Sequence, residues 1–259
     1  MMHVLIGDIG NTTTKICLIE INTFKIKKVI YFASNNIFSK NFLKKNINKI
    51  IKKKSINKEA LFSSVVPKYH FILKKFLKEF YKINLREIKE KGINKIIKIN
   101  IKNRNHVGSD RIANAVGAYK KYKRDCIVLD FGTATTFDVV TKNGNYNGGI
   151  IAPGVSLSIK SLVRSADQIP FFNIKKQKKI IGKNTIEALR SGFYWGYSGL
   201  INNIISRIEK ETKKKYKTIF TGGYANLFKT SITRPFKIDK NITINGIIEI
   251  FKKNKKYLY

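Results

Sequence analysis

The sequence has few of the residues that define several special classes of protein. Among 259 residues there are two cysteines, four prolines, one tryptophan and three histidines. Two cysteines, Cys17 and Cys126, are too few for a disulfide framework, and neither lies in a Cys-x-x-Cys or Cys/His spacing typical of zinc sites. The sequence therefore predicts a protein of a reducing compartment, which we expect to be the cytoplasm, without structural zinc.

Long apolar runs are missing as well. No run approaches the ~18 apolar residues that a membrane-spanning helix requires. The first residues, MMHVLIGDIG, lack the basic segment of a signal peptide and reach Asp8 and Gly10 after a short apolar run. We expect neither export nor insertion into a membrane.

Acidic residues are scarce, since 16 Asp and Glu stand against 52 Lys and Arg, for a net charge of +36. Such a charge ordinarily indicates nucleic acid as a partner, because clustered cations release counterions from phosphates. Here 44 of the cations are lysine and 8 are arginine, beside 42 isoleucines and 25 asparagines. Lysine, isoleucine and asparagine share A/T-rich codons, whereas a dedicated nucleic-acid face favours arginine. We expect only nonspecific, salt-sensitive adhesion to polyanions.

What the sequence has is enough apolar residues for a core. With 43% hydrophobic and 12% aromatic residues, the chain can fold as one large domain or two small ones. Apolar spacing predicts strands over 3–8, 12–20, 61–67 and 217–223, and three more strands within 126–154 with a hairpin at 143–144. It predicts helices over 36–53, 69–82, 110–122, 185–215 and 243–256. The region from 155 to about 184 is polar.

A weak internal repeat is the most informative feature. The run VLIGDIGNTTTKICLI recurs as CIVLDFGTATTFDVV, 122 residues later. Asp8 matches Asp130 and Gly10 matches Gly132, while the threonines align as Thr13 with Thr135 and Thr14 with Thr136. Two strand-turn-strand units half a chain apart predict duplicated halves that face each other across a cleft.

These turns have a chemistry suited to phosphate. Glycine lets the backbone expose N–H groups to an anion, threonine hydroxyls donate further hydrogen bonds, and aspartate supplies an oxygen ligand for Mg²⁺. One Asp-x-Gly turn alone is commonplace. Two in register, with a third glycine turn at 221–223, predict two phosphate loops and a nucleoside pocket.

With these motifs the chain resembles the type III pantothenate kinases, within the superfamily of acetate kinase, sugar kinases, heat-shock chaperones and actin. The resemblance rests on DIGNTTTK (8–15), VGSDRIANAVGAY (107–119), DFGTATTFDVV (130–140), YNGGIIAPG (146–154), IGKNT (181–185), SGFYWG (191–196) and TGGYA (221–225). It implies an α/β, actin-like (ribonuclease H-like) fold with mixed sheets. The expected lobes are residues 1–117 and 118–259, with the terminal helix free to pack back on the first lobe.

The resemblance also implies an activity, the transfer of the γ-phosphoryl group of ATP to the primary alcohol of pantothenate, which opens coenzyme A synthesis. Asp110 becomes the general base, Asp130 the site of a potassium or ammonium ion, and Mg²⁺ accompanies ATP. A homodimer is expected to shape the pantothenate pocket. The implied contacts to ATP are Asp8, Ile9, Gly10, Asn11, Thr12, Thr13, Thr14, Lys15 and Thr133, and those to pantothenate are Gly108, Ser109, Asp110, Arg111, Thr185 and position 101.

Some positions have plainer interpretations or depart from the family. Asp110 equally fits the acidic start of a helix, with Arg111 as its salt-bridge partner, and Thr185 fits a helix N-cap. Ile101 stands where the family commonly has a tyrosine that touches substrate, and Ser109 replaces an alanine. Tyr194 and Trp195 are expected in the core, and His106 is not expected to be catalytic.

The sequence is also compatible with two other functions. One is a kinase for a different small alcohol in the same superfamily. The other is a regulatory or nucleic-acid-binding protein, because some members of the family were first described as Bvg accessory factors linked to transcription.

Overall fold

The computed structural model describes residues 1–52, 54–93 and 95–254. The chain divides into two compact units, the first made of residues 1–121 with the segment that begins at Asn241, and the second of residues 122–240. Each unit has its own sheet and its own hydrophobic core. No helix in the described ranges has the length and apolar character needed to cross a membrane.

The sheet of the first unit has the strand order β3-β2-β1-β5-β6, with β4 also paired to β1. The strands are β1 (Met2–Ile9), β2 (Thr13–Glu20), β3 (Ile26–Ala33), β4 (Ser55–Ile56), β5 (Glu59–Ser64) and β6 (Asn84–Glu87). β1, β2 and β3 are antiparallel, whereas β5 and β6 continue the sheet in parallel. The predicted hairpin over 3–20 is confirmed.

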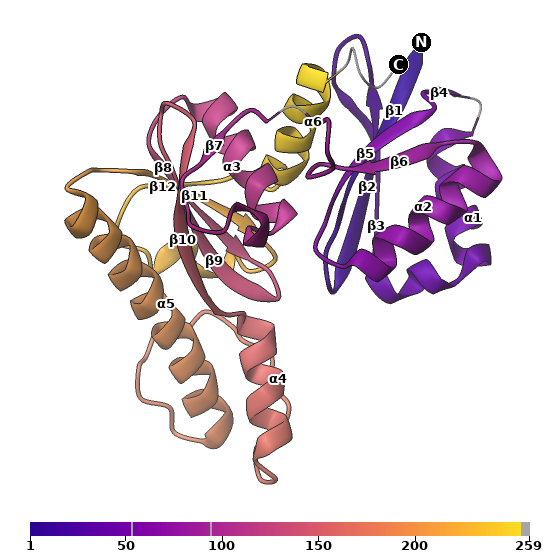
Figure 1. Ribbon diagram of the computed structural model, residues 1–259. Helices are drawn as coiled ribbons and strands as arrows, with labels where there is room; N and C mark the ends of the chain where they lie inside the picture. The colour runs from indigo at the N-terminus through magenta and orange to yellow at the C-terminus, as the bar shows by residue number, and fades with distance from the viewer. Residues whose placement is uncertain (53, 94, 255–259) are drawn as a thin grey trace. The chain divides into compact units, whose positions relative to one another are not determined.

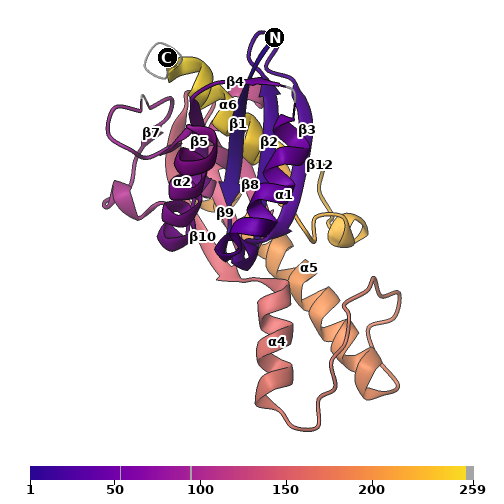
Figure 2. The ribbon, with the colours of Figure 1, turned by 90° about the vertical axis from the view of Figure 1, so that its right-hand side faces the viewer.

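The described part of the first unit also contains α-helices and short 3-10 helices. The short helix η1 (Ser34–Phe38) leads from β3 into α1 (Lys40–Ile51), and α1 lies beside α2 (Pro67–Tyr81) against one side of the sheet (Figures 1 and 2). Their buried leucines, isoleucines and phenylalanines complete the core. The segment after β6 contains β7 (Lys98–Ile99) and η2 (Arg104–His106) and ends in α3 (Ser109–Tyr122).

Helices α3 and α6 (Ile242–Asn254) cross at very short range. A Cβ placed on Gly117 would lie 2.3 Å from the carbonyl oxygen of Ile242, and one on Gly246 would lie 1.8 Å from that of Ala113. Only glycine permits backbones to come this close. Since α6 also contacts β1 and β5, the last described helix completes the unit that the first strand begins.

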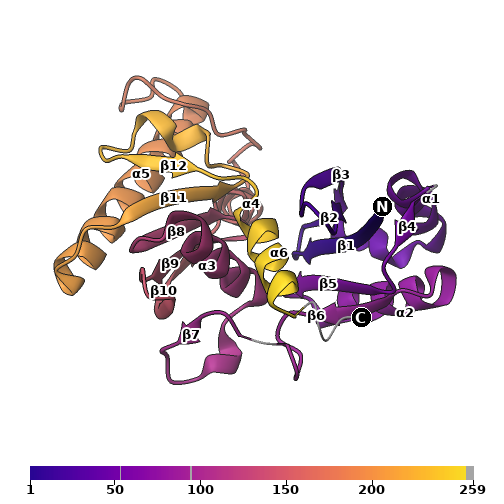
Figure 3. The same cartoon turned by 90° about the horizontal axis from the view of Figure 1, so that it is seen from above.

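The second unit repeats the arrangement of the first. Its strands run β12-β11-β8-β9-β10 (Figure 3), with β8 (Cys126–Phe131), β9 (Ala134–Val140) and β10 (Asn145–Pro153) antiparallel and β11 (Lys217–Gly222) and β12 (Phe236–Ile238) added in parallel. Three antiparallel strands followed by two parallel ones occur in both sheets. The predicted duplication is therefore present in the topology.

Two helices of the second unit extend beyond its sheet. They are α4 (Val155–Ser165) and α5 (Thr185–Thr212), and the segment that joins them lies along the first half of α5 (Figures 1 and 2). The region predicted as polar from 155 to about 184 begins with α4, a helix that the sequence did not predict. Its serines hide the helical spacing of Val155 and Ile159, which are both buried in the core.

The other predicted elements agree with the structure except at their ends. The helix predicted over 36–53 is η1 followed by α1, and the one predicted over 243–256 is α6. Residues 53, 255 and 256 of these predictions lie outside the described residues. The strand β3 was not predicted, because its lysines and mostly exposed side chains mask the strand pattern.

Candidate active site

The first glycine turn joins β1 to β2. Residues Gly10, Asn11 and Thr12 form the connection, and the amide of Gly10 donates to the carbonyl of Thr13 over 3.1 Å. The side chains of residues 11–13 are exposed, so this tip is open to a ligand. Ile9 and Thr14 have no exposed surface, so the part of the turn open to solvent lies between them.

Asp8 and Lys15 stand opposite each other across this hairpin. Directly paired residues of antiparallel strands project to the same face of the sheet, so an acidic and a basic group lie side by side at the base of the turn. The Lys15 ammonium donates to Asn241 Oδ1 over 2.8 Å and lies 5.2 Å from the centre of the Tyr31 ring. These contacts hold one cation beside the phosphate-type turn.

Asp110 lies in the first turn of α3, where a carboxylate is stabilised by the helix dipole. Its Oδ1 accepts a hydrogen bond from the amide of Arg111 over 2.8 Å. Burial raises the pKa of Asp110 above its ordinary value, opposed by that hydrogen bond and by the charges of Arg111 and Lys89. The interpretation as a helix start is thus correct, and it does not compete with catalysis, because the same geometry presents a half-buried carboxylate.

The segment that enters α3 is held by side chains that the sequence did not single out. Lys89 Nζ donates to the carbonyls of Asn105 and Val107 over 2.9 and 3.0 Å, and the Lys89 amide donates to Glu87 Oε2 over 2.6 Å. Burial raises the pKa of Glu87, while the Ser109 side chain favours its charged form. Ser109, one of the departures from the family, therefore acts on Glu87.

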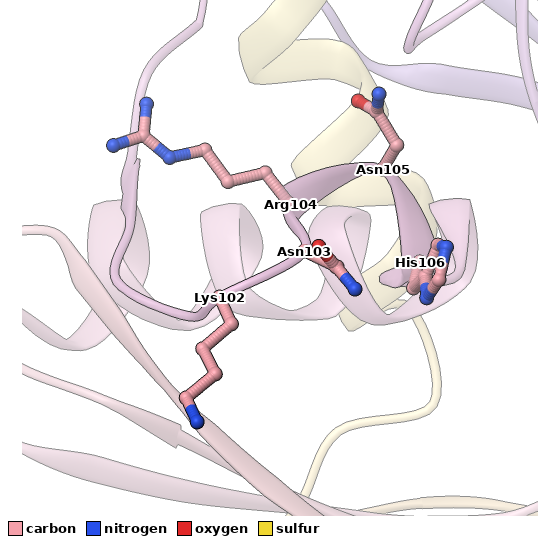
Figure 4. Close-up of a pocket in the computed structure, with 5 residues that line it drawn as sticks. All are labelled: Lys102, Asn103, Arg104, Asn105 and His106. Atoms are coloured by element: carbon pink, nitrogen blue, oxygen red, sulfur yellow. The ribbon is translucent and has the colours of Figure 1, made fainter.

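The residues just before this helix line an open hollow of about 400 Å³ (Figure 4). They are Lys102, Asn103, Arg104, Asn105 and His106, all exposed. The Lys102 and Arg104 side chains point away from each other in Figure 4, so the two cations do not converge on one anion. Ile101, which stands at the position of the family tyrosine, is half-buried beside them.

The second glycine turn joins β8 to β9 and is one residue shorter than the first. Ile9 pairs with Thr14 in the first hairpin, but Phe131 pairs with Thr135 in the second. The pairing therefore makes Thr14 and Thr135 equivalent, whereas the sequence repeat aligned Thr14 with Thr136. Thr135 is buried like Thr14, and the exposed tip consists of residues 132 and 133.

Asp130 is the next-to-last residue of β8, and the missing side chain of Gly222 leaves room beside it. Gly222 has φ +85°, and a Cβ there would lie 2.6 Å from Asp130 Oδ1. A Cβ on Gly154 would lie 2.2 Å from the carbonyl oxygen of Thr133. In the described residues no three His, Cys, Asp or Glu side chains form a metal-binding group. A Cβ on Gly222 would also lie 2.6 Å from the Phe131 carbonyl oxygen, so a carboxylate and a carbonyl border this space. Both are oxygen ligands of the kind that a hard cation takes.

Thr185 is exposed at the first residue of α5, and Asn184 is the actual N-cap, since its Oδ1 accepts from the amide of Glu187 over 2.9 Å. The interpretation of Thr185 as a cap is therefore wrong. Tyr194 is 1% exposed and stacks on Phe228, which confirms it as core, and Trp195 packs partly buried against the same cluster.

Comparisons with known proteins agree with this geometry. Among solved structures, a protein described as a Baf family transcriptional activator from Campylobacter jejuni superposes with a TM-score of 0.63 at 21% identity, covering 98% of this chain and all of that one. An activator of 2-hydroxyisocaproyl-CoA dehydratase from Clostridium difficile, solved with bound ADPNP, gives a TM-score of 0.56 at 10% identity, covering 99% of this chain and 97% of that one. The duplicated sheets, each with a glycine turn, therefore identify an actin-like ATPase fold, as the sequence predicted.

The sequence narrows this class to one family. The profile described as type III pantothenate kinase matches residues 4–207. A type III pantothenate kinase from Pelagibacter ubique is 50% identical over 248 residues, covering 95% of this chain and 97% of that protein. Another, from Paramagnetospirillum magneticum, is 39% identical over 195 residues, covering 75% of each chain. The chain belongs to the type III pantothenate kinase family.

Proposed function

We infer that this chain transfers the γ-phosphoryl group of ATP to the primary alcohol of pantothenate, giving 4′-phosphopantothenate at the start of coenzyme A synthesis. The observation that carries the inference is the 50% identity to a type III pantothenate kinase along 95% of the chain. Family membership makes the chain a kinase. We propose that its net charge of +36 supports only nonspecific binding of nucleic acid.

Asp110 is the catalytic base in this proposal. Its carboxylate takes the proton of the pantothenate hydroxyl while the hydroxyl oxygen attacks the γ-phosphorus. A new oxygen–phosphorus bond forms, the bond from the γ-phosphorus to the β,γ-bridging oxygen breaks, and ADP leaves. Phosphoryl transfer needs mainly alignment and charge neutralisation, so an aspartate that orients the hydroxyl is sufficient. The carboxylate, fixed by the Arg111 amide, is suited to that alignment.

The two glycine turns bind the phosphates of ATP. In the first turn, the exposed backbone and hydroxyls of residues 10–13 donate to phosphate oxygens, with Lys15 as the neighbouring cation. Thr133 does the same in the second turn. Kinases of this family act on ATP with a divalent metal, which we propose to be Mg²⁺ carried on the phosphates and reached by Asp8. We assign a potassium or ammonium ion to Asp130, on the space that Gly222 leaves beside it.

Pantothenate is proposed to lie against the start of α3. Gly108, Ser109 and Arg111 surround the base in sequence, and the Arg111 guanidinium pairs with the pantothenate carboxylate. Ile101 cannot supply the hydroxyl of the family tyrosine, so one substrate contact is lost. Thr185, exposed at the start of α5, adds a contact by resemblance.

We also propose a homodimer in the cytoplasm. The second unit exposes large apolar side chains on β10, α4 and the segment before α5, among them Ile151 at 64%, Phe171 at 65% and Ile181 at 72%. Exposed apolar groups of this size commonly mark interaction surfaces. Cys17 and Cys126 are free and buried, which suits a reducing compartment.

A coupled assay of ADP release tests the function. Purified protein is incubated with ATP and Mg²⁺, with and without pantothenate, first in potassium and then in sodium buffer. We expect ADP release that requires both pantothenate and potassium or ammonium. A panel of sugars and other small alcohols serves as the control, and release of ADP with one of these but not with pantothenate contradicts the proposal.

A further inference from the structure

A buried serine from another strand braces the first glycine turn. Ser34 has no exposed surface and stands where β3 passes into η1. Its amide donates to the carbonyl of Thr12 over 2.9 Å. Its Oγ donates to the carbonyl of Gly10 over 2.7 Å and lies 2.9 Å from Thr14 Oγ1. One residue thus contacts three positions of the turn.

The direction of the two hydroxyl protons follows from the partners. A serine hydroxyl has one proton, and a backbone carbonyl can only accept. The Ser34 proton therefore goes to the Gly10 carbonyl, and the short contact with Thr14 is a hydrogen bond that Thr14 donates. The result is a directed chain from Thr14 to Ser34 to Gly10, buried at Thr14 and Ser34 and partly exposed at Gly10.

The hydroxyl and the amide of Ser34 together determine where two N–H groups of the turn point. In a trans peptide the carbonyl of one residue and the N–H of the next point in opposite directions. Because the carbonyls of Gly10 and Thr12 are turned toward Ser34, the N–H groups of Asn11 and Thr13 are turned away from it. Residues 11–13 are the exposed tip, so Ser34 holds two donors in place for an anion. The hydroxyl chain fixes the Asn11 N–H through the Gly10 carbonyl, and the Ser34 amide fixes the Thr13 N–H through the Thr12 carbonyl. Glycine at position 10 would otherwise let its peptide rotate easily.

We propose that Ser34 and Thr14 are positioning residues that hold the phosphate-binding amides of the first turn, and that Thr14 acts through Ser34 rather than on the nucleotide. The proposal rests on the assignment of ATP phosphates to this turn. The second turn is built differently, since the equivalent Thr135 hydroxyl is buried without a hydrogen-bond partner in the described part of the chain. The brace therefore belongs to the first turn.

Calorimetric binding of a nonhydrolysable ATP analogue and of adenosine tests the proposal on the full chain. Ser34→Ala and Thr14→Val each remove one link, and loss of a buried hydrogen bond predicts about ten-fold weaker binding of the analogue. Adenosine, which has no phosphate, is expected to bind as in the unaltered protein. Thr14→Ser keeps the hydroxyl and should recover most of the affinity. In kinetics, KM for ATP rises and KM for pantothenate stays constant.

Thr218→Val is the matched control, because Thr218 in β11 is 1% exposed and its hydroxyl has no hydrogen-bond partner within the described ranges. The proposal is overturned if both link-breaking variants bind the analogue as the unaltered protein does, or if adenosine binding weakens equally. An unaltered protein that binds the analogue yet fails to phosphorylate pantothenate refutes the proposed function alone. If it binds no ATP analogue, both are refuted.

Discussion

At the scale of single residues, Asp110 is in an environment that suits a reaction better than it suits stability. Burial raises its pKa, which means that the folded chain resists ionisation of this carboxyl. Below the pKa of the unfolded chain the group is neutral in both states. Between the pKa of the unfolded chain and the higher pKa of the folded chain, the unfolded chain has lost this proton while the folded chain still holds it. The free energy of unfolding therefore falls as the pH rises through this interval.

Asp110→Asn is therefore expected to have opposite effects on activity and on stability. Loss of the base should reduce kcat by at least ~10²-fold with ATP binding retained. Near pH 7 the variant should melt at a higher temperature than the unaltered protein. This difference in melting temperature should become smaller toward pH 3. Steady-state kinetics and thermal melts across pH measure both effects. Normal turnover in the variant would remove Asp110 from the mechanism.

The pH profile gives a second prediction at this scale. If Asp110 is the base, as proposed, it must be ionised to accept a proton. Because its pKa is raised, the acid limb of kcat/KM should then lie above the ordinary aspartate pKa of about 3.9. The Lys89 charge lowers the pKa of Asp110, so Lys89→Met should move the limb to still higher pH. Lys91→Met, two residues away and exposed, is the control and should leave the limb in place. An unchanged limb in both variants would contradict the electrostatic coupling.

At the scale of elements, the hairpins around both glycine turns could be predicted, because each consists of two apolar segments that are adjacent in the sequence and separated by a short glycine turn. Asp130 could be picked out from the repeat of these turns, whereas Asp110 was singled out only by the resemblance to the family. Ser34 and Lys89 could not be picked out, because their partners lie 16 to 24 residues away and only strand pairing and the path of the 104–108 segment bring them together. α4 was missed because five of its eleven residues are serine or lysine, which interrupt its apolar spacing.

The crossing of α3 and α6 makes a prediction about stability. Gly246→Ala places a methyl group against the Ala113 carbonyl, with no flexible side chain to move aside. Overpacking of this kind costs roughly 1–3 kcal/mol or more. Chemical denaturation should show this loss, whereas Lys253→Ala on the exposed side of α6 should stay within about 0.5 kcal/mol of the unaltered protein. Equal stability of the two variants would mean that the helices separate easily.

At the scale of the whole molecule, the apolar surface of the second unit predicts how the proposed dimer can be broken. The double variant Ile151→Glu/Ile181→Glu places two charges on side chains that are 64% and 72% exposed. Burying those charges in an interface is costly, so we expect monomers by light scattering coupled to size exclusion. Phe71→Glu, on α2 of the first unit and 68% exposed, is the matched control and should remain dimeric.

The net charge of +36 makes a prediction of its own. If lysines scattered over the surface cause the attraction, duplex DNA of any sequence should bind alike at low salt. The affinity should fall by several orders of magnitude as salt rises from ~50 to ~200 mM, as counterion release requires for many phosphate contacts. Filter binding with two unrelated duplexes measures it. Binding that survives high salt and prefers one sequence would instead indicate a specific regulatory site.

The return of α6 to the first unit has a consequence for synthesis on the ribosome. When α3 has been made, its glycine groove still lacks the helix that fills it, and roughly 120 further residues must be translated before Gly246 arrives. At ~5–20 residues per second this takes on the order of 6–25 s. During that interval the face of α3 that α6 later covers is exposed on the nascent chain, and we expect chaperones to bind it. The second unit has its own sheet and core, so we expect it to fold as it leaves the ribosome.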